Sequence, residues 1–354
     1  MRVGLLVACA ILAGAENIVN AQPYTATQET VDGVSVVRLT EPGREIRVSI
    51  ATKVGNIAYE MSLGGRNILW FPYDSVADFA AKPRLCGNPF LWPWANRLDS
   101  DGFYANGKRY ELNTGLANFG RDGNKQPIHG LVQFTPLWEV VSLTADDSSA
   151  SVTSRLEFSR HPDLAAQFPF SHTVEMTYRL SAGKLEVRTR IENLSTETMP
   201  VSLGYHPYFK VHDAPRDDWT VSLAARKRWK LNDKLVPTGE STDAAASFPS
   251  LERLRLKGIT LDDVFGDLIR GAEGKARFWV QGAQQRIEVV YGPKFDTAVV
   301  YAPSGDARSF VCFEPMAGIT NAFNLAHEGK YRDLQTIPAG QSWQESYWIV
   351  PSGF

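Results

Sequence analysis

The sequence places three titratable side chains inside short apolar runs that are typical of strands. They are His129 in the run PIHG, His206 in the run GYHPYF, and Glu314 in the run CFEP. Two histidines and one glutamate can supply one general acid and one general base on opposite sides of a small neutral ligand, as the opening and closing of a sugar ring requires. Because these runs span most of the chain, only folding can bring them together.

Glu314 follows a strand-like run, residues 309–313, and precedes Pro315. Because proline cannot continue a central ladder of hydrogen bonds, we expect the strand to end there. A carboxylate at the rim of a sheet can face a cleft, and loss of water raises its pKa towards that of a useful general base. A salt-bridged or exposed glutamate is the alternative interpretation.

His206 lies among apolar and aromatic neighbours, so its ring is expected to be packed and oriented. An imidazole titrates near neutrality and can donate a proton as a general acid. A core histidine bonded to a carbonyl is the alternative.

His129 precedes Gly130, which permits close approach of the backbone. Four further histidines have weaker contexts, two in polar loops and two that look peripheral: His161, His212, His172 and His327.

Arg97 ends the aromatic run FLWPWANR. Its guanidinium group can stack on an aromatic ring, pair with a carboxylate, or donate hydrogen bonds to sugar hydroxyls. Asp262 and Asp263 are adjacent, which suggests binding of calcium or of hydroxyl groups. A helix cap or a turn explains the aspartate pair equally well.

Several classes of function find no support in the sequence. It contains no G-x-S-x-G elbow, no phosphate-binding P-loop and no H-E-x-x-H motif, and its histidines lack zinc-site spacing. With 37 basic and 39 acidic residues the formal charge is −2, so no basic excess exists to neutralise nucleic-acid phosphates. We expect no cofactor, no catalytic metal and no nucleic-acid partner, and leave open only calcium at the aspartate pair.

Alternation with period two dominates the chain. In residues 185–192, apolar or β-branched side chains alternate with charged ones, as in a half-buried antiparallel strand. Helical periodicity is confined to residues 75–82, with a single further turn expected at 251–256. The pattern predicts an all-β fold, a large antiparallel β-sandwich with few short helices, formed as one domain by residues 22–354. Residues 212–250 are the most polar stretch and are expected to form surface excursions.

The N-terminus has the pattern of a secretory signal peptide. Arg2 precedes an apolar run, and Val19 and Ala21 are small residues at the usual positions before a cleavage site. We predict a signal peptide of residues 1–21 and a periplasmic or secreted mature protein; a buried N-terminal helix is the alternative. The apolar run is short for a membrane span of about 20 residues, so no membrane anchor is expected in the mature form.

Cys86 and Cys312 are expected to be buried free thiols.

Taken in order, several runs of the chain resemble the aldose 1-epimerase family, also called galactose mutarotases, over roughly residues 30–350. The matching runs are GGRNILW (64–70), NPF (88–90), WANR (94–97), GF (102–103), IHG (128–130), FPFS (168–171), GYHPYF (204–209), PTGE (237–240), LDDVF (261–265), EP (314–315) and NAFN (321–324). The resemblance implies a galactose mutarotase-like supersandwich acting on a free monosaccharide. It further implies that Glu314 is the general base and His206 the general acid, that His129 binds or polarises the sugar near its ring oxygen, and that Arg97 and Asp262 hold hydroxyls.

The chain departs from the family pattern at two positions. Leu131 follows Gly130 where well-studied members have a second glycine, and Tyr205 precedes the second histidine where they have asparagine. These features are more similar to a divergent bacterial branch and leave the preferred sugar open. Two alternative functions remain. A hexose-phosphate 1-epimerase would need several cations for phosphate, and only Arg97 is well placed. A non-catalytic carbohydrate-binding protein would not need both His206 and Glu314. For either function we expect a monomer or a homodimer.

Overall fold

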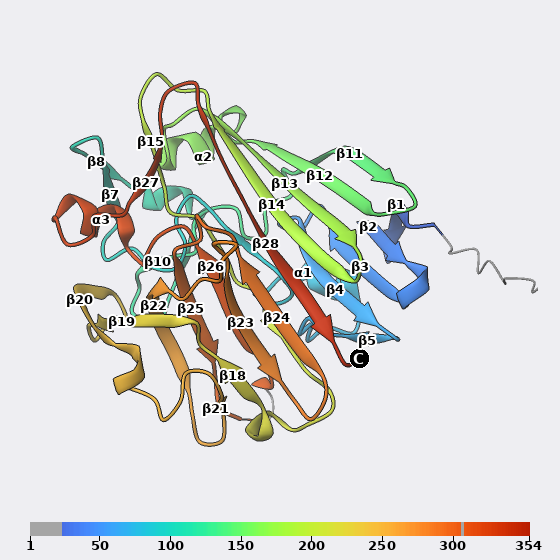
Figure 1. Ribbon diagram of the computed structural model, residues 1–354. Coiled ribbons are helices and arrows are strands. Elements are labelled where there is room, and N and C mark those ends of the chain that lie inside the picture. The colour runs from blue at the N-terminus through green and yellow to red at the C-terminus, as the bar shows by residue number, and fades with distance from the viewer. Residues whose placement is uncertain (1–22, 306–307) are drawn as a thin grey trace, which may run out of the picture.

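The computed structural model describes residues 23–305 and 308–354. Their strands form three large sheets, paired antiparallel along the ladders (Figure 1), and this confirms the all-β sandwich predicted from the period-two pattern. Sequence segments with alternating apolar side chains bury one face of each strand, which is why these sheets pack on one another. The predicted signal peptide, with Cys9, lies outside the described residues.

The first sheet has five strands in chain order, blue in Figure 1. They are β1 (Thr25–Val31), β2 (Val34–Glu41), β3 (Ile46–Ala51), β4 (Ile57–Leu63) and β5 (Arg66–Asn67). The second sheet has nine strands. In spatial order they are β11 (Glu139–Ala145), β12 (Ala150–Glu157), β13 (His172–Ser181), β14 (Lys184–Asn193), β28 (Ser342–Ser352), β24 (Arg286–Tyr291), β23 (Ala276–Gln281), β18 (Thr220–Ser222) and β21 (Leu254–Arg255).

The third sheet has eight strands and carries most of the predicted site. In spatial order they are β20 (Pro237–Asp243), β19 (Ala225–Leu231), β22 (Leu261–Leu268), β25 (Thr297–Ala302), β26 (Val311–Met316), β16 (Gly204–Tyr205) and β6 (Phe90–Leu91), with β17 (Tyr208–Phe209) also pairing β26. Three two-stranded ribbons complete the described sheets. They pair β7 (Gly102–Ala105) with β8 (Lys108–Glu111), β9 (Gly120–Arg121) with β10 (Pro127–Ile128), and β15 (Met199–Val201) with β27 (Gln335–Ile337).

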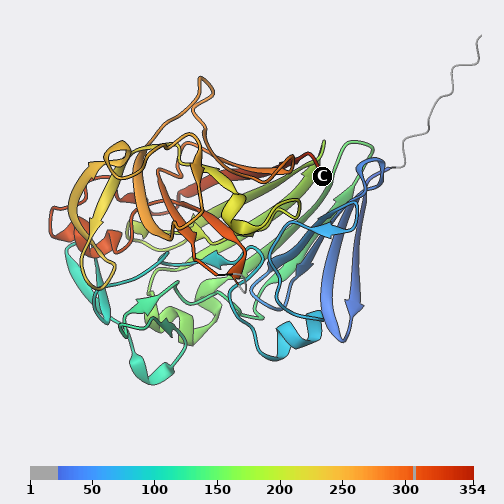
Figure 2. The same ribbon diagram turned by 90° about the horizontal axis from the view of Figure 1, so that it is seen from below.

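The nine-stranded sheet is the centre of the fold. β28, red in Figure 1, lies between β14 and β24, so the C-terminal strand joins the green and orange halves of the sheet. Along β14, Leu185, Val187 and Ile191 are buried while the charged residues between them are partly or fully exposed, as the alternation predicted. Figure 2 shows the other two sheets at opposite ends of the same side, the blue strands β1–β5 at one end and the orange strands of the third sheet at the other.

One continuous apolar core connects the three sheets. It includes Val37 of β2, Val174 of β13 and Phe313 of β26, all fully buried. Strand β2 contacts β12 and β13, and β23 contacts β26, so each smaller sheet packs on the central one. Packing of the third sheet on the central sheet holds in place the strands that carry the predicted site residues.

Helices are few and short, as expected. Among the described residues the α-helices are α1 (Val76–Ala81), α2 (Pro162–Gln167) and α3 (Ala322–His327). The helix predicted at 75–82 is confirmed as α1, and the Ser75 hydroxyl caps it by accepting from the Asp78 N–H at 3.1 Å. The same residues contain no helix long and apolar enough to cross a membrane.

Two expectations about irregular segments are wrong. Residues 251–256 form no helical turn, because Leu254 and Arg255 pair with Val221 and Thr220 of β18. Residues 212–250 are not all loop, because β18, β19 and β20 lie there; β20 forms one edge of the third sheet, which explains the polar sequence. Elsewhere, the connections between strands and helices include 3₁₀ helices at Pro42–Arg44, Thr114–Leu116, Phe158–Arg160, Arg216–Asp218 and Ala244–Ala246.

Candidate active site

The side chains of Glu314 and His206 contact each other beside β26, an inner strand of the third sheet. Glu314 lies on β26 opposite Val299 of β25, and His206 lies in the two-residue connection between β16 and β17, which both pair with β26. Nε2 of His206 is 3.2 Å from Oε1 of Glu314, and their side chains are only 8% and 1% exposed. The predicted end of the strand before Pro315 is wrong: β26 continues to Met316, where Pro315 and Met316 pair with Ala298 and Thr297 of β25.

His129 approaches the same pair from a different segment. Its N–H donates to the Asn96 carbonyl at 2.8 Å, and its ring lies edge-on to that of His206 with centroids 5.4 Å apart. Gly130 has φ +71°, and a Cβ built there would lie 2.1 Å from the Trp92 carbonyl oxygen. Glycine is therefore required for the backbone to pass close enough to Trp92 and turn His129 inward.

Arg97 is held by several acceptors. Its Nε donates to Asp122 at 2.7 Å, its Nη1 donates to the Asn96 side-chain oxygen at 2.9 Å, and its Nη2 is 3.9 Å from Asp262. Asp122 itself accepts backbone N–H bonds from Asn124 and Gln126. Asp122 is not among the predicted site residues, because no apolar run in the sequence surrounds it.

The two adjacent aspartates point to opposite sides of β22. Asp262 is near Arg97, with a side chain 37% exposed, whereas Asp263 is paired with Arg228 by contacts of 2.7 and 2.6 Å. Successive side chains of a strand face opposite ways, so the two carboxylates cannot converge on one calcium ion. The calcium hypothesis left open by the sequence therefore does not fit this geometry.

All five predicted residues line one pocket of about 270 Å³. Five further residues complete its wall: Asn96, Ile128 and Tyr208, which lie within the runs named above without being assigned a role, and Leu85 and Tyr301, which lie outside them. Tyr208 stacks on the His206 ring, with centroids 4.6 Å apart and planes within 8°. Its position two residues after His206 was visible in the sequence, but only pairing of β17 with β26 brings it over that ring.

Burial controls the protonation of these groups. It lowers the pKa of His206 to about 3 and, with the neighbouring His206 and Arg97, lowers the pKa of His129 well below its ordinary value. Burial, with Asp262 adding to it and Arg97 opposing it, raises the pKa of Glu314 well above its ordinary value. Both shifts favour the neutral forms, a carboxyl group facing an imidazole, and such a pair holds one transferable proton.

Asp262 and Asp122 differ in protonation tendency. Burial raises the pKa of Asp262, with Arg97 opposing the shift and Asp263 adding to it. Burial also acts to raise the pKa of Asp122, but hydrogen bonds from Arg97 and the Gln126 backbone outweigh it and the net pKa is lowered. Asp122 thus favours its anionic form, and its carboxylate orients the Arg97 guanidinium group.

Three polar atoms in the pocket remain available for a ligand. Nδ1 of His129, Nδ1 of His206 and Oε2 of Glu314 are buried and have no hydrogen-bond partner within the described chain. Buried polar groups are normally satisfied, so unpaired atoms on three converging residues indicate a polar ligand site.

A metal centre fits these residues poorly. Within the described ranges, one group of donor atoms is close enough to ligate a metal: His206, Cys312 and Glu314, with atoms within 4.8 Å of one another. Burial, with the nearby Glu314, raises the pKa of the Cys312 thiol well above its ordinary value. This shift and that of Glu314 both favour the neutral forms, whereas a metal binds thiolate and carboxylate, so a metal ion would have to displace a proton from each of these groups. Cys312 and Cys86 are both free and buried, as expected.

The other histidines lie outside this pocket. His212 and His327 are exposed and His161 is partly exposed. His172 is not peripheral, because its side chain is fully buried. Its Nδ1 lies 2.6 Å from the Phe170 carbonyl and its Nε2 accepts from the Trp92 indole N–H at 2.9 Å, so it is a core histidine.

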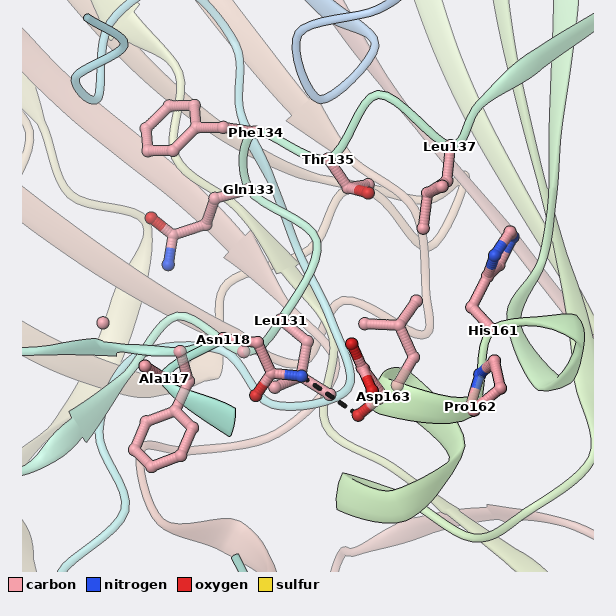
Figure 3. A pocket seen from close by; sticks show the side chains of 14 residues that line it. Ala117, Asn118, Leu131, Gln133, Phe134, Thr135, Leu137, His161, Pro162 and Asp163 are labelled. Atoms are coloured by element: carbon pink, nitrogen blue, oxygen red, sulfur yellow. Dashed lines mark hydrogen bonds between the residues drawn. The ribbon is translucent and has the colours of Figure 1, made fainter. Parts of the chain in front are cut away.

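A larger cavity of about 770 Å³ lies next to the site segment and is shown in Figure 3. Gly130 and Leu131, immediately after His129, form part of its wall. Its amide side chains are already occupied: Asn118 donates to the Asp163 carbonyl at 3.0 Å, the dashed line in Figure 3, and Gln133 donates to the Ile128 carbonyl at 3.2 Å. None of the five predicted site residues lines this cavity.

Comparison with known proteins agrees with the fold. The model of the aldose 1-epimerase family matches residues 36–349, so this chain belongs to that family. Membership indicates an isomerase-type enzyme that acts on small sugars.

Among individual relatives, the uncharacterised Escherichia coli K12 protein YihR is 24% identical over 235 residues, 66% of this chain and 70% of YihR. A galactose mutarotase-like protein from Clostridium acetobutylicum has a similar structure, with TM-score 0.82 at 22% identity, covering 94% of this chain and 99% of that one. Galactose 1-epimerase from Lactobacillus acidophilus NCFM superposes with TM-score 0.72 at 14% identity, covering 93% and 98%. These structural similarities concern the fold.

Proposed function

We propose that this protein is an aldose 1-epimerase that interconverts the α and β anomers of a free, unphosphorylated aldose. The observation that carries the proposal is the 3.2 Å contact between Nε2 of His206 and Oε1 of Glu314 inside a buried polar pocket. A carboxyl–imidazole pair sharing one proton can remove a proton from one sugar oxygen and deliver a proton to another.

Sugar binding uses the charged and amide groups at the pocket wall. Arg97, already oriented by Asp122, donates to sugar hydroxyls, and Asp262 accepts from them. His129, kept neutral by burial, donates or accepts at the sugar near its ring oxygen. Tyr208 and Tyr301 offer ring surface to the apolar parts of the sugar.

The reaction needs the shared proton on His206 and a negative charge on Glu314. The ligand hydroxyls stabilise the carboxylate by hydrogen bonding, and the proton crosses the 3.2 Å contact to Nε2. Glu314 then accepts the proton of the anomeric hydroxyl while His206 donates to the ring oxygen. The bond between C1 and the ring oxygen breaks and a C1 aldehyde forms. After rotation about the C1–C2 bond the roles reverse, and the ring closes on the other face.

The charge of the pocket supports a sugar without phosphate. Among the described residues that line it, Arg97 is the one permanent cation, and it is already close to both Asp122 and Asp262. A phosphate group would need further donors and would face the Asp262 carboxylate. A hexose-phosphate 1-epimerase is therefore the weaker candidate.

The experiment is polarimetry of freshly dissolved α-D-glucose and α-D-galactose with the wild-type protein and the variants Glu314→Gln and His206→Ala. Each substitution is expected to lower the catalysed rate by about 10²–10⁴-fold, the usual contribution of one acid or base. Glu41→Gln is the matched control, because Glu41 is also buried, 3% exposed, but it ends β2 in the first sheet and pairs with Arg44.

Two outcomes would contradict the proposal. Retention of the wild-type rate by Glu314→Gln would remove this pair from the chemistry. Saturable sugar binding without acceleration for any member of an aldose panel would favour a carbohydrate-binding protein.

We further propose that the enzyme acts in the periplasm after removal of residues 1–21. The test is N-terminal sequencing of the protein from fractionated cells: a periplasmic protein that starts at Gln22 is expected, and one that starts at Met1 would contradict the proposal.

A further inference from the structure

A second polar cavity, of about 730 Å³, lies against the third sheet. Strands β19, β22 and β25 and the segment after α3 form its wall. Its polar and aromatic lining includes Trp229, Asp296, Thr297, Tyr331 and Asp333. None of the residues of the His206–Glu314 pocket takes part in it.

The two cavities occupy the same face of the sheet at different positions along the strands. Thr297 lines the second cavity and Tyr301, four residues later on β25, lines the first. Residues four apart on a strand share a face and are about 13 Å apart at a rise of about 3.3 Å per residue. A buried apolar cluster that includes Val264, Val299 and Met316 lies on this face between them. The second cavity is therefore a separate compartment rather than an extension of the first.

Two hydrogen-bond donors in this cavity are unpaired. The indole Nε1 of Trp229 and the hydroxyl of Tyr331 are buried without a hydrogen-bond partner of normal geometry in the part of the chain that the structure describes, although the Tyr331 hydroxyl lies near enough to the Ile319 backbone and the Thr297 side chain for both to lower its pKa. Tyr331 is only 5% exposed. A Cβ on Gly266 would lie 2.8 Å from the Trp229 Nε1, so glycine is what lets the indole lie against the strand. Leaving two such donors unpaired costs stability, which points to a ligand with acceptors.

Carboxylates beside these donors supply the matching acceptors. Asp296 accepts from the Thr297 hydroxyl at 3.0 Å, and burial, with Asp333 nearby, raises its pKa to about 6. All three groups line the cavity, and the Asp296 and Asp333 carboxylates also add to the rise that burial causes in the pKa of Tyr331.

The basic groups at this cavity give no anion site. The Arg270 guanidinium group donates to the carbonyls of Gly274, Gly292 and Phe295, and is thus used within the backbone. Lys227 is exposed, and Asp267, Asp296 and Asp333 outnumber it. Nor do the aspartates form a group of three donors close enough for a metal ion, as judged over the described residues.

We propose that this cavity is a second binding site for a neutral cyclic polyol, such as one monosaccharide unit. Such a ligand presents hydroxyl groups that accept from Trp229 and Tyr331 and donate to Asp296 and Asp333. Its C–H faces pack against the two aromatic rings, which lie at 76° to each other with centroids 6.3 Å apart. The site would bind sugar independently of the His206–Glu314 pair.

The test is ¹⁹F NMR of protein labelled with 5-fluorotryptophan. The sequence has nine tryptophans, and the resonance missing from Trp229→Phe is that of Trp229. No tryptophan lines the His206–Glu314 pocket, so this resonance reports on the second cavity. Titration with D-galactose and with myo-inositol, which cannot undergo ring opening, is expected to shift it saturably. The same shift is expected in Glu314→Gln, which separates this site from the proposed catalytic function.

Tyr331→Phe removes one hydroxyl and keeps the ring, so it is expected to weaken the polyol affinity about three- to tenfold, as for the loss of one hydrogen bond. The remaining tryptophan resonances show whether the variant is folded. Tyr73→Phe is the matched control, since its hydroxyl donates to the Lys82 carbonyl at an exposed position. No saturable shift with either polyol, a shift produced by Ca²⁺ alone, or unchanged affinity in Tyr331→Phe would each overturn the proposal.

Discussion

The neighbours Asp262 and Asp263 allow a sharp test of the site, because they have the same chemistry on opposite faces of β22. Asp262 lines the pocket near Arg97, whereas Asp263 is paired with Arg228. We therefore expect Asp262→Asn to impair sugar turnover at unchanged stability, and Asp263→Asn to impair stability at unchanged turnover.

The structure sets the magnitudes. A hydrogen bond to a charged group contributes about 1.5–3 kcal/mol, and the Asp262 side chain is 37% exposed, which favours the lower end. About 1.5 kcal/mol corresponds to a kcat/KM reduced about tenfold. Asp263 is 10% exposed but Arg228 is 39% exposed, so loss of their ion pair is expected to cost about 1 kcal/mol.

The assays are polarimetric kcat/KM and urea unfolding, both measured on the two variants and on wild type. A tenfold loss of kcat/KM in Asp263→Asn without a change in unfolding free energy would refute the strand register used here. Equal losses of activity in both variants, with no difference in stability, would also refute it.

Three further predictions concern the support of the site and the packing of the core. Asp122→Asn is expected to raise KM about tenfold more than it changes kcat, because Arg97 loses its charged partner; an unchanged KM in steady-state kinetics would contradict this. Gly130→Ala is expected to lower the urea midpoint strongly, because its Cβ would meet the Trp92 carbonyl; a wild-type midpoint would contradict the backbone path. Burial lowers the pKa of His172 to about 4, so the folded protein binds fewer protons than the unfolded one. The buried neutral His172 therefore contributes about 3 kcal/mol to the free energy of unfolding above about pH 6.5, and this contribution is lost as the pH falls from about 6.5 to 4. In urea titrations, the free energy of unfolding should depend less steeply on pH in His172→Gln than in wild type.

Local patterns predicted much of the fold. Alternation in residues 185–192 predicted a half-buried strand, because the side-chain period of a strand is two and one face must be apolar. Ser75 before an apolar helical stretch predicted α1. The pattern failed at residues 251–256, where pairing with β18 decided the conformation, and at His172, whose burial depends on packing against Trp92 and Phe158 from distant segments.

By itself, the sequence determined an all-β chain of the aldose 1-epimerase family and the residue types available for proton transfer, because alternation, turn residues and short apolar runs are local properties. Only the tertiary structure decided which polar groups meet. The contact of His206 with Glu314, the support of Arg97 by Asp122, and the second cavity around Trp229 and Tyr331 all depend on strand register between segments far apart in the chain. Register also fixed which of the two adjacent aspartates faces the pocket, because a shift of one residue along β22 exchanges the two faces of the strand.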